Sequence, residues 1–421
     1  MDKFIIEGGT PLVGTIPVSG SKNAALPIIA AALLGNSETI IHNIPRLQDI
    51  YTFNNVLRVV GSKVDFDEEE NSVSIDPTGV SYLEAPYDLV RKMRASFYML
   101  GALVGKHGYA KVSLPGGCAW GPRPVDLHLK GMEAMGINIS LEKGYVIATA
   151  DETLKGGNFT LEPSSVGATV NLLLASVLKA EKFVINNAAK EPDVVQLCNV
   201  LVKMGASIEG IGTSTLSIRK VDSLKGVEIS NDPDRIELGT YMIAGAMIPG
   251  SDLTLTGCDP EQLGDFPELL RKTGTSVEID GNVIKVKAPD TLKPVSITTD
   301  IYPGFPTDLQ AQWATMLTQA DGESSVTDTV YFDRFSYVPE LVRLGADMHN
   351  EKNTVHIKGK TPLAGATVMS TDLRASVSLV LAGMVAENTT EVLRIYHLDR
   401  GYESLENKLN PVGAKLTRVE D

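Results

Sequence analysis

The chain has 421 residues and carries 38 Lys and Arg against 52 Asp and Glu, which gives a formal net charge of -14. Such a surface repels phosphate backbones, so the composition argues against a nucleic-acid-binding protein. A hydrophobic fraction of 43% supplies a large core, and a chain of this length exceeds what one core usually reaches. We therefore expect an ordered protein of more than one domain.

The distribution of cysteine and of apolar residues excludes further classes. Cys118, Cys198 and Cys258 are odd in number and scattered, and no His or Cys residues have the spacing of a zinc site. We therefore expect neither disulfides nor a structural metal. The first residues show no secretory signal, and the longest apolar run, residues 24–34, is too short to cross a bilayer. The sequence predicts a soluble, cytoplasmic protein.

Residues 19–76 predict one small α/β unit. In chain order it consists of a polar turn (19–23), a helix (24–34), a strand (38–43), a second helix that ends at Gly61, and a two-stranded meander that ends at Asp76. The first helix is apolar nearly all round, which indicates that it is buried. Pro27 is tolerated near its first turn, and Gly35 ends it.

The same order of elements recurs six times along the chain. The second helix of each unit ends at a glycine that precedes a strand, and these junction glycines are Gly61, Gly136, Gly205, Gly274, Gly345 and Gly413. They are about 70 residues apart, which is longer than a solenoid repeat and fits a small α/β unit. The first helices of the later units are predicted at 92–104, 166–178, 235–247, 308–318 and 372–385. Most units are also preceded by a short strand, and these strands are predicted at 11–18, 154–159, 224–229 and 363–368.

Aligning the units on their junction glycines places several charged residues at helix starts. Those ahead of first helices include Lys22, Arg94, Ser165, Arg235, Asp308 and Arg374, and those ahead of second helices include Arg46, Arg123, Lys190, Arg334 and Arg400. Cations at helix N-termini are unfavourable by about 0.3–1 kcal/mol each, so they indicate an anionic ligand, which helix starts also attract. Ser165, Thr307 and Asp372 have a plainer alternative as helix N-caps.

The segment 114–124 predicts an exposed loop, because it is rich in glycine and proline. Cys118 lies in this loop, where its thiol is expected to be accessible and tuned by Arg123. Cys198 and Cys258 are instead expected to be small buried side chains. No nearby His suggests a Cys–His nucleophile, so acid chemistry or redox sensitivity fits Cys118 better.

Six stretches together resemble the UDP-N-acetylglucosamine 1-carboxyvinyltransferase family, a branch of the EPSP synthase-like enolpyruvyl transferases. They are 19–27 (SGSKNAALP), 115–118 (PGGC), 123–128 (RPVDLH), 305–312 (FPTDLQAQ), 371–376 (TDLRAS) and 399–403 (DRGYE). The resemblance runs over essentially the whole chain, in order. It implies an α/β fold of two inside-out barrel domains, each of three repeated units.

The resemblance also implies a domain division and an activity. Residues 22–232 would form the first domain, which carries the Cys118 loop, and 1–21 would join 233–421 in the second, with the active site in the cleft between them. The implied reaction transfers the enolpyruvyl group of phosphoenolpyruvate to the 3′-hydroxyl of UDP-N-acetylglucosamine and releases phosphate, by addition and elimination. It is the first committed step of peptidoglycan synthesis. No metal, organic cofactor, nucleic acid, membrane or obligate protein partner is implied beyond the two small-molecule substrates.

The family resemblance assigns roles to the charged residues. Cys118 matches the general acid, which can also carry a phosphoenolpyruvate adduct, and Asp308 matches the carboxylate that takes the hydroxyl proton. Lys22, Arg123 and Arg400 match the cations around phosphoenolpyruvate, which stabilise charge as the tetrahedral intermediate forms. The Cys118 loop would close over the bound nucleotide sugar and exclude water.

Further positions match contacts to the substrates. Those that hold the nucleotide sugar are Asn23, Arg94, Pro124, Val125, Asp126, Leu127, Ser165, Val166 and Val330. Asp372 and Arg374 match residues that border the reacting groups. Three positions depart from the family pattern: Pro163 stands where several members have Lys, Phe332 replaces an acidic residue, and Trp120 is bulkier than the usual aliphatic residue.

Other functions remain open from the sequence. The shikimate-pathway enolpyruvyl transferase has a related fold and the same donor, and analysis of the product with each acceptor would separate the two. A non-catalytic paralogue that only binds the substrates would release no phosphate, although Lys22, Cys118, Asp308 and Arg400 are all present. A third possibility, a repeat protein that only serves as a structural scaffold, does not explain the cations at helix starts.

Overall fold

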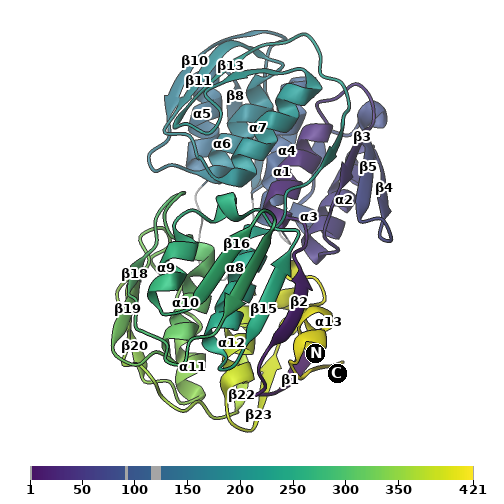
Figure 1. Cartoon of the computed structure of the whole chain (residues 1–421). Coiled ribbons are helices and arrows are strands. Elements are labelled where there is room, and N and C mark those ends of the chain that lie inside the picture. Colours follow the sequence, from purple (N-terminus) through teal and green to yellow (C-terminus); the bar gives the residue numbers. More distant parts are fainter. Residues whose placement is uncertain (1, 91–92, 115–124, 421) are drawn as a thin grey trace. The chain divides into compact units, whose positions relative to one another are not determined.

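The computed structural model describes residues 2–90, 93–114 and 125–420, and the chain divides into two compact units (Figure 1). Unit 1 consists of Met1–Ser19 together with Pro233–Asp421, and unit 2 is the continuous segment Gly20–Asp232. Each unit has its own cluster of buried apolar side chains. No helix in the described part of the chain combines the length and apolar character that a bilayer-spanning segment needs.

In its described residues, unit 2 has three four-stranded sheets, each made of one parallel pair followed by two antiparallel pairs. In spatial order they are β14 (Glu228–Ser230), β3 (Thr39–His42), β5 (Ser72–Asp76), β4 (Lys63–Asp67); β6 (Glu84–Ala85), β7 (Tyr109–Ser113), β9 (Tyr145–Thr149), β8 (Asn138–Glu142); and β10 (Leu154–Thr160), β11 (Ala180–Asn186), β13 (Thr215–Arg219), β12 (Ser207–Glu209). The repetition of one strand order three times confirms the repeated α/β unit.

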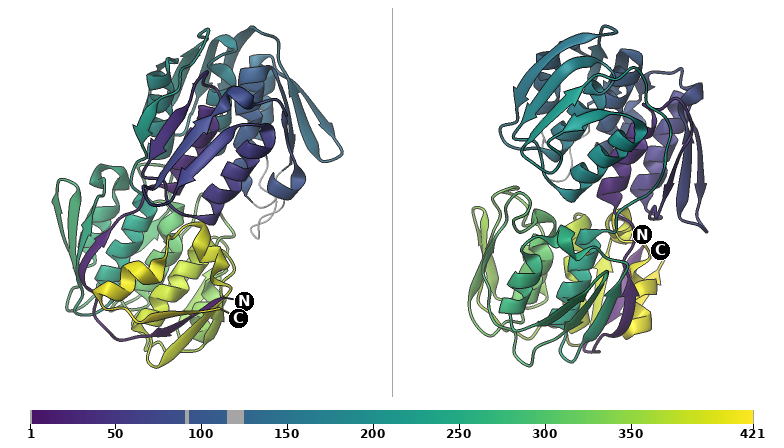
Figure 2. Two further views of the ribbon diagram at one scale, coloured as in Figure 1. Left: turned by 90° about the vertical axis from the view of Figure 1, so that its right-hand side faces the viewer. Right: turned by 45° about the horizontal axis from the view of Figure 1, so that its top comes forward.

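The helices of unit 2 follow the same repetition. The first helices are α1 (Lys22–Ala32), α4 (Tyr98–His107) and α6 (Val166–Ser176), and the second helices are α2 (Gln48–Val60), α5 (Asp126–Met135) and α7 (Pro192–Met204), with the short α3 (Tyr87–Val90) before α4. The first helices pack on one another at the centre, and the sheets lie outside them (Figure 2). Every residue of α1 from Ala24 to Ala32 is buried, which confirms the prediction from its apolar sequence.

Unit 1 repeats this architecture. Its sheets, over the described residues, are β16 (Ser276–Asp280), β17 (Val283–Lys287), β15 (Asp252–Thr256), β2 (Val13–Pro17); β18 (Ile297–Thr298), β19 (Ser324–Thr327), β21 (Thr354–Ile357), β20 (Met348–Glu351); and β22 (Thr367–Met369), β23 (Thr389–Leu393), β1 (Lys3–Glu7), β24 (Leu416–Val419). Its helices are α8 (Arg235–Met247), α9 (Phe266–Lys272), α10 (Gln310–Leu317), α11 (Val338–Arg343), α12 (Leu373–Val385) and α13 (Leu405–Leu409). Both units are therefore inside-out α/β bodies, with α8, α10 and α12 at the centre of unit 1.

Two strands precede a first helix of one unit in the chain but pair within the other unit. The strand β2 precedes α1 in the chain, but it pairs in parallel with β15 of unit 1. Likewise β14 precedes α8, but it pairs in parallel with β3 of unit 2. The chain passes from one unit to the other directly after each of these strands.

The N-terminal strand completes the last sheet. The strand β1 pairs antiparallel with β23 on one side and with β24 on the other, so the two ends of the chain lie side by side in unit 1 (Figure 2). The chain thus closes its sixth repeat with its own first strand.

The junction glycines have the backbone conformation that the repeat requires. All six have positive φ values, between 93° and 118°. A helix commonly ends with one residue in the left-handed region, and glycine adopts it without the cost of a Cβ. The conformation confirms that these glycines end the second helices.

The predicted starts of the first helices are confirmed in some units and shifted in others. The helix predicted at 235–247 is α8. The helix predicted at 308–318 begins instead with a 3-10 turn, Thr307–Leu309, and continues as α10. A 3-10 turn, Arg94–Phe97, likewise precedes α4, and position 92 lies outside the described residues.

Candidate functional site

Asp308 stands in the turn before α10 and contacts two arginines from other elements of unit 1. Its Oδ1 lies 2.7 Å from Nη1 of Arg334, and its Oδ2 lies 2.8 Å from Nη2 of Arg374. The side chains of Arg334 and Arg374 are only 10% and 7% exposed, whereas that of Asp308 is 25% exposed. The carboxylate is therefore clamped between two largely buried cations and keeps one accessible side.

The two guanidinium groups decide the protonation state of Asp308. Burial by itself would raise the pKa of the carboxyl, but the charges and hydrogen bonds of Arg374 and Arg334 outweigh it and hold the pKa well below its usual value. The group is consequently ionised at neutral pH and can accept a proton.

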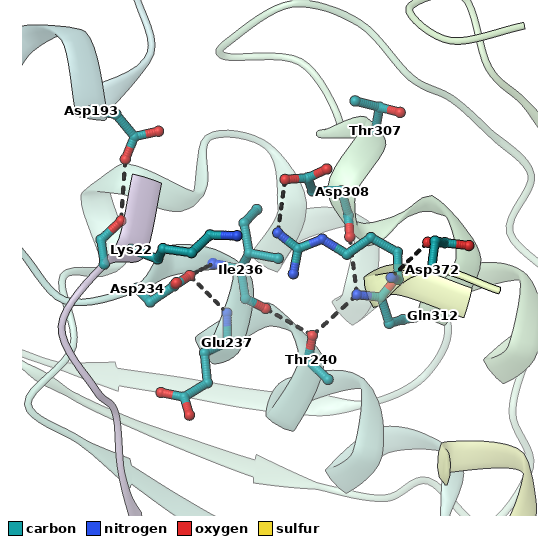
Figure 3. Close-up of polar contacts among 12 residues, drawn as sticks. Lys22, Asp193, Asp234, Ile236, Glu237, Thr240, Thr307, Asp308, Gln312 and Asp372 are labelled. Atoms are coloured by element: carbon teal, nitrogen blue, oxygen red, sulfur yellow. Dashed lines mark hydrogen bonds and ion pairs between the residues drawn. The ribbon is translucent and has the colours of Figure 1, made fainter. Parts of the chain in front are cut away.

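A buried polar cluster supports this clamp from the centre of unit 1 (Figure 3). Nε2 of Gln312 donates to the backbone carbonyl of Asp308 at 3.0 Å, to Oγ1 of Thr240 at 3.2 Å and to the hydroxyl of Tyr402 at 3.3 Å. The Tyr402 hydroxyl also accepts from Nη1 of Arg374 at 3.4 Å. Helices α8, α10 and α12 thus fix both Asp308 and its partner Arg374 through one network.

Asp372 caps α12 and thereby orients Arg374. Its Oδ1 accepts hydrogen bonds from the backbone N–H groups of Arg374 and Ala375, at 2.8 and 3.1 Å.

The half-buried His397 has a pKa lowered by burial and by Arg400, while Asp372 acts in the opposite direction and raises it. Asp372 and Arg400 therefore both lie near His397.

In unit 2, Lys22 begins α1 directly after the N-cap Ser21, whose hydroxyl accepts from Ala24 N at 3.2 Å. The Lys22 ammonium lies 3.1 Å from Oδ2 of Asp49 in the first turn of α2, and the two side chains are 12% and 6% exposed. Ser21 in turn donates to Oδ1 of Asp193 at 3.3 Å. Asn23, the next residue of α1, is half-buried.

Cations at these helix starts have counter-charges within the protein. We inferred that cations at helix starts require an anionic ligand, but Asp49 already balances Lys22, and Asp308 already balances Arg374. Arg94 and Arg400 also have polar or electrostatic interactions within the protein. Sequence spacing could not show these carboxylates, because they come from other elements of the fold.

A second cluster of unit 2 surrounds the buried His128 in α5. Burial, reinforced by Arg94, lowers the pKa of His128 to about 3, so the ring is neutral. Asn171 fixes the tautomer: its Oδ1 accepts from Gly101 N at 2.9 Å, which leaves its Nδ2 to donate to His128 Nδ1 at 2.9 Å. The ring proton is thus on Nε2, and both Arg94 and Asp126 lie near enough to influence the ring electrostatically.

The remaining nucleotide-sugar positions of unit 2 lie at two helix starts. Ser165 is the N-cap of α6 and accepts from Ala168 N at 3.3 Å, so the capping alternative holds for it, and Val166 is the first residue of that helix. Val125 precedes α5, whose first residues are Asp126 and Leu127. Cys118, Arg123 and Pro124 lie outside the described residues.

In unit 1, Val330 belongs to a turn after β19 and donates its backbone N–H to Oδ1 of Asp328 at 2.9 Å. Of the three residues with a capping alternative, Asp372 is also an N-cap, whereas the Thr307 hydroxyl bonds to Asp328 instead. The structure therefore brings Asp308 and Arg374 into direct contact, and Asp372 and Arg400 both act electrostatically on His397.

Several residues of these clusters were not assigned to the site from the sequence. Among them are Asp49, Gln312, Arg334 and Tyr402. Arg334 had a usable signal, because it stands at the same repeat position as Arg123 and Arg400, ahead of a second helix. Gln312 and Tyr402 lie within the family-like stretches but carry no charge to draw attention.

The described residues contain no group of three or more His, Cys, Asp or Glu side chains that could hold a metal ion. Cys198 and Cys258 are buried, as predicted, and burial raises the pKa of the Cys198 thiol to about 12. What the clusters offer instead is an ionised carboxylate beside several cations, an arrangement suited to moving a proton next to an anionic group.

Comparison with known proteins gives concordant matches. Residues 6–409 match the family model of EPSP synthase (3-phosphoshikimate 1-carboxyvinyltransferase). The chain is 52% identical to a UDP-N-acetylglucosamine 1-carboxyvinyltransferase of Chloroherpeton thalassium, over 99% of this chain and 97% of that protein. It is 49% identical to a protein of the same name from Desulfosudis oleivorans, over the full length of both.

Solved structures agree on the fold. The enolpyruvyl transferase NikO from Streptomyces tendae matches with a TM-score of 0.90 and 26% identity, over 99% of each chain. The EPSP synthase from Acinetobacter baumannii matches over the full length of both chains with a TM-score of 0.78, but at 19% identity, so that likeness concerns the fold alone.

Proposed function

Because the chain belongs to the EPSP synthase family, we propose that it transfers the enolpyruvyl group of phosphoenolpyruvate to the 3′-hydroxyl of UDP-N-acetylglucosamine and releases phosphate. The product would be UDP-N-acetylglucosamine-enolpyruvate, which makes the reaction the first committed step of peptidoglycan synthesis. The proposal also places the protein in the cytoplasm, where both substrates are made, and gives it no obligate protein partner.

The observation that supports the choice of acceptor is the full-length similarity to UDP-N-acetylglucosamine 1-carboxyvinyltransferases, at 52% identity over 99% of this chain. The family model by itself leaves the acceptor open, since it is described by the shikimate enzyme. The EPSP synthase structure has only 19% identity, which is the reason to prefer the nucleotide sugar over shikimate 3-phosphate.

The reaction requires proton transfers at two places. In the addition step, the sugar hydroxyl oxygen bonds to C2 of phosphoenolpyruvate, C3 takes a proton, and the hydroxyl proton leaves to a base. In the elimination step, C3 gives up a proton, the C2–O bond to phosphate breaks, and the double bond returns. A suitable protein needs one acid, one base and cations around the phosphate and carboxylate groups.

We assign these tasks as follows. Asp308 accepts the hydroxyl proton, since its two arginine neighbours keep it ionised while a quarter of its side chain stays exposed. Cys118 is the general acid. Lys22, Arg123 and Arg400 bind the anionic groups of phosphoenolpyruvate, and Asp49 orients the ammonium of Lys22 until the substrate arrives.

The nucleotide sugar would contact positions in both units. We assign to it Asn23, Arg94, Pro124, Val125, Asp126, Leu127, Ser165, Val166 and Val330, with Asp372 and Arg374 bordering the reacting groups. The location of the active site in a cleft between two domains stays a prediction.

A phosphate-release assay tests the proposal. With phosphoenolpyruvate present, we expect inorganic phosphate to appear when UDP-N-acetylglucosamine is added and not when shikimate 3-phosphate is added. Phosphate release with shikimate 3-phosphate but not with UDP-N-acetylglucosamine would identify the protein as the shikimate-pathway enolpyruvyl transferase instead. No release with either acceptor, while both substrates bind by calorimetry, would support a non-catalytic binding protein.

The role of Asp308 is tested separately with Asp308→Ala. We expect this variant to lose turnover and to keep its affinity for UDP-N-acetylglucosamine, because the nucleotide sugar is assigned many other contacts. Binding should be measured by calorimetry at a temperature where circular dichroism shows the variant folded. Near-normal phosphate release by the folded variant would remove Asp308 from the role of base.

A further inference from the structure

Asp328 is a completely buried carboxylate that the proposed mechanism does not use. It follows β19 in unit 1 and has no exposed surface. Its side chain accepts four hydrogen bonds, from Thr299 Oγ1 (2.8 Å), Thr307 Oγ1 (2.7 Å), Val330 N (2.9 Å) and Tyr331 N (2.8 Å). Burying an ionised carboxylate is costly unless it is fully hydrogen-bonded, so this arrangement needs a reason.

The two oxygens of Asp328 have different partners. Oδ1 accepts from Thr299 and from the two backbone N–H groups of the 328–331 turn, which is a local structural task. Oδ2 accepts from one group only, the hydroxyl of Thr307. Thr307 and Asp308 stand on the same turn (Figure 3), so this single bond links Asp328 to the residue next to the proposed base.

The Thr307 hydroxyl then connects to Arg334. A hydroxyl has one hydrogen, and this one is donated to Asp328, so the oxygen lone pairs are free to accept. Nη1 of Arg334 donates to that oxygen at 3.2 Å and lies 2.7 Å from Oδ1 of Asp308. Asp328 therefore sets the direction of the Thr307 hydroxyl, and the hydroxyl holds the nitrogen that contacts Asp308.

We propose that Asp328 and Thr307 are positioning residues for the transfer reaction: through the chain Asp328–Thr307–Arg334 they fix the guanidinium that orients the Asp308 carboxylate. This inference rests on the proposed function, because it takes Asp308 to be the base. The geometry favours it over a purely local role, since the local turn engages only Oδ1 and would be complete without the bond from Oδ2 to Thr307.

The sharpest test removes only the linking hydroxyl, by Thr307→Val. We expect kcat to fall about tenfold or more, because small misplacements of catalytic groups cost up to about 100-fold. The KM for UDP-N-acetylglucosamine should change little. The acid limb of the kcat/KM profile should move to higher pH, because a loosened Arg334 stabilises the ionised Asp308 less. Thr307→Ser keeps the hydroxyl and should restore most of the lost kcat.

A matched control is Thr354→Val, which removes a threonine hydroxyl that bonds to Thr327 Oγ1 at 2.9 Å on the sheet of the same unit. It should leave kcat and the pH profile unchanged. If Thr307→Val behaves like this control, or lowers the melting temperature without moving the pH profile, Asp328 and Thr307 have a structural role only and the inference is wrong.

Asp328→Asn provides the second variant. Its amide can present an oxygen to the three donors at Oδ1 and an NH2 group to Thr307, which reverses the hydrogen bond there and turns the hydroxyl proton away from Asp328. We expect the same loss in kcat and the same displacement of the acid limb as in Thr307→Val. If Asp308→Ala loses activity but Thr307→Val and Asp328→Asn keep it, the positioning chain is refuted and the proposed base is not. If Asp308→Ala keeps its activity, the proposed base is refuted.

Discussion

Replacing Asp308 by Asn is expected to destabilise unit 1 as well as to inactivate the protein. The change keeps the shape of the side chain but leaves Arg334 and Arg374, which are 10% and 7% exposed, without their common counter-charge. The Asn oxygen can accept from one guanidinium, and its NH2 group then faces the other. Breaking a buried ion pair on one side costs about 3–5 kcal/mol.

This cost converts into a measurable shift in melting temperature. For a unit of about 200 residues, each kcal/mol lowers the melting temperature by about 2–4 °C, so we expect a decrease on the order of 10 °C. Differential scanning calorimetry at pH 7 measures it. Asp252→Asn, a change at an exposed aspartate in β15 of the same unit, serves as the control and should shift the transition little.

The pH dependence of this difference gives a second measurement. The folded-state pKa of Asp308 lies below the ordinary value of 3.8, so its ionised form stabilises the fold throughout the range above that value, and the contribution disappears only as the pH falls through the lower folded pKa. The gap between wild type and Asp308→Asn should therefore stay constant from pH 8 to about 5 and narrow only in stronger acid. A gap that closes near pH 6, or no gap at pH 7, would refute the clamp.

Three further changes have definite expected outcomes. Gly101→Ala places a Cβ 2.5 Å from the backbone oxygen of Asn171, so it should lower the free energy of unfolding of unit 2 by about 1–3 kcal/mol. Denaturant unfolding measures this, and an unchanged midpoint would contradict the close packing of α4 on α6. Lys408→Met leaves Glu237, which is 2% exposed, without its cation at 2.8 Å, and should cost about 3–5 kcal/mol, with partial recovery on adding Glu237→Gln. We expect a thiol-alkylating epoxide of the fosfomycin type to form a covalent adduct with the wild type and none with Cys118→Asp, as read by intact mass; an equal adduct in both would exclude Cys118 as the target.

The repeat architecture could be predicted because its signals are local. A helix that is apolar on all sides is buried wherever it lies, and a junction glycine ends a helix through its own backbone conformation. The boundaries of α8 follow from such signals, from Asp234 as a cap to the end of the apolar stretch. The pairing of β2 and β14 could not be predicted from local patterns, since it is decided by segments far away in the chain, and only the family resemblance implied that 1–21 joins 233–421.

The candidate site could be predicted only in part for the same reason. Sequence similarity pointed to Asp308, and its position before a helix was visible in the repeat. The two arginines that govern its ionisation come from a turn and from another helix, and no spacing rule connects them to it. For Lys22, the sequence showed the cation but not Asp49, and this produced the mistaken inference that the charge was uncompensated.

Two of the six first helices begin differently from the others. Four of the six first helices begin with a side-chain cap, namely Ser21 for α1, Ser165 for α6, Asp234 for α8 and Asp372 for α12. In the described part of the chain, α4 and α10 have no such cap, and each is preceded by a 3-10 turn, which contains Arg94 and Asp308 respectively.

The oxygens of a capping carboxylate accept hydrogen bonds from backbone N–H groups, as those of Asp372 do, and the carboxylate is then less available to a substrate. Asp308 stands at the equivalent place but bonds to two side chains and keeps an exposed side. With Asp308 as the proposed base, the uncapped start of α10 leaves its carboxylate to side-chain partners and substrate rather than to backbone N–H groups. It predicts that restoring a cap there would stabilise the helix at the expense of turnover.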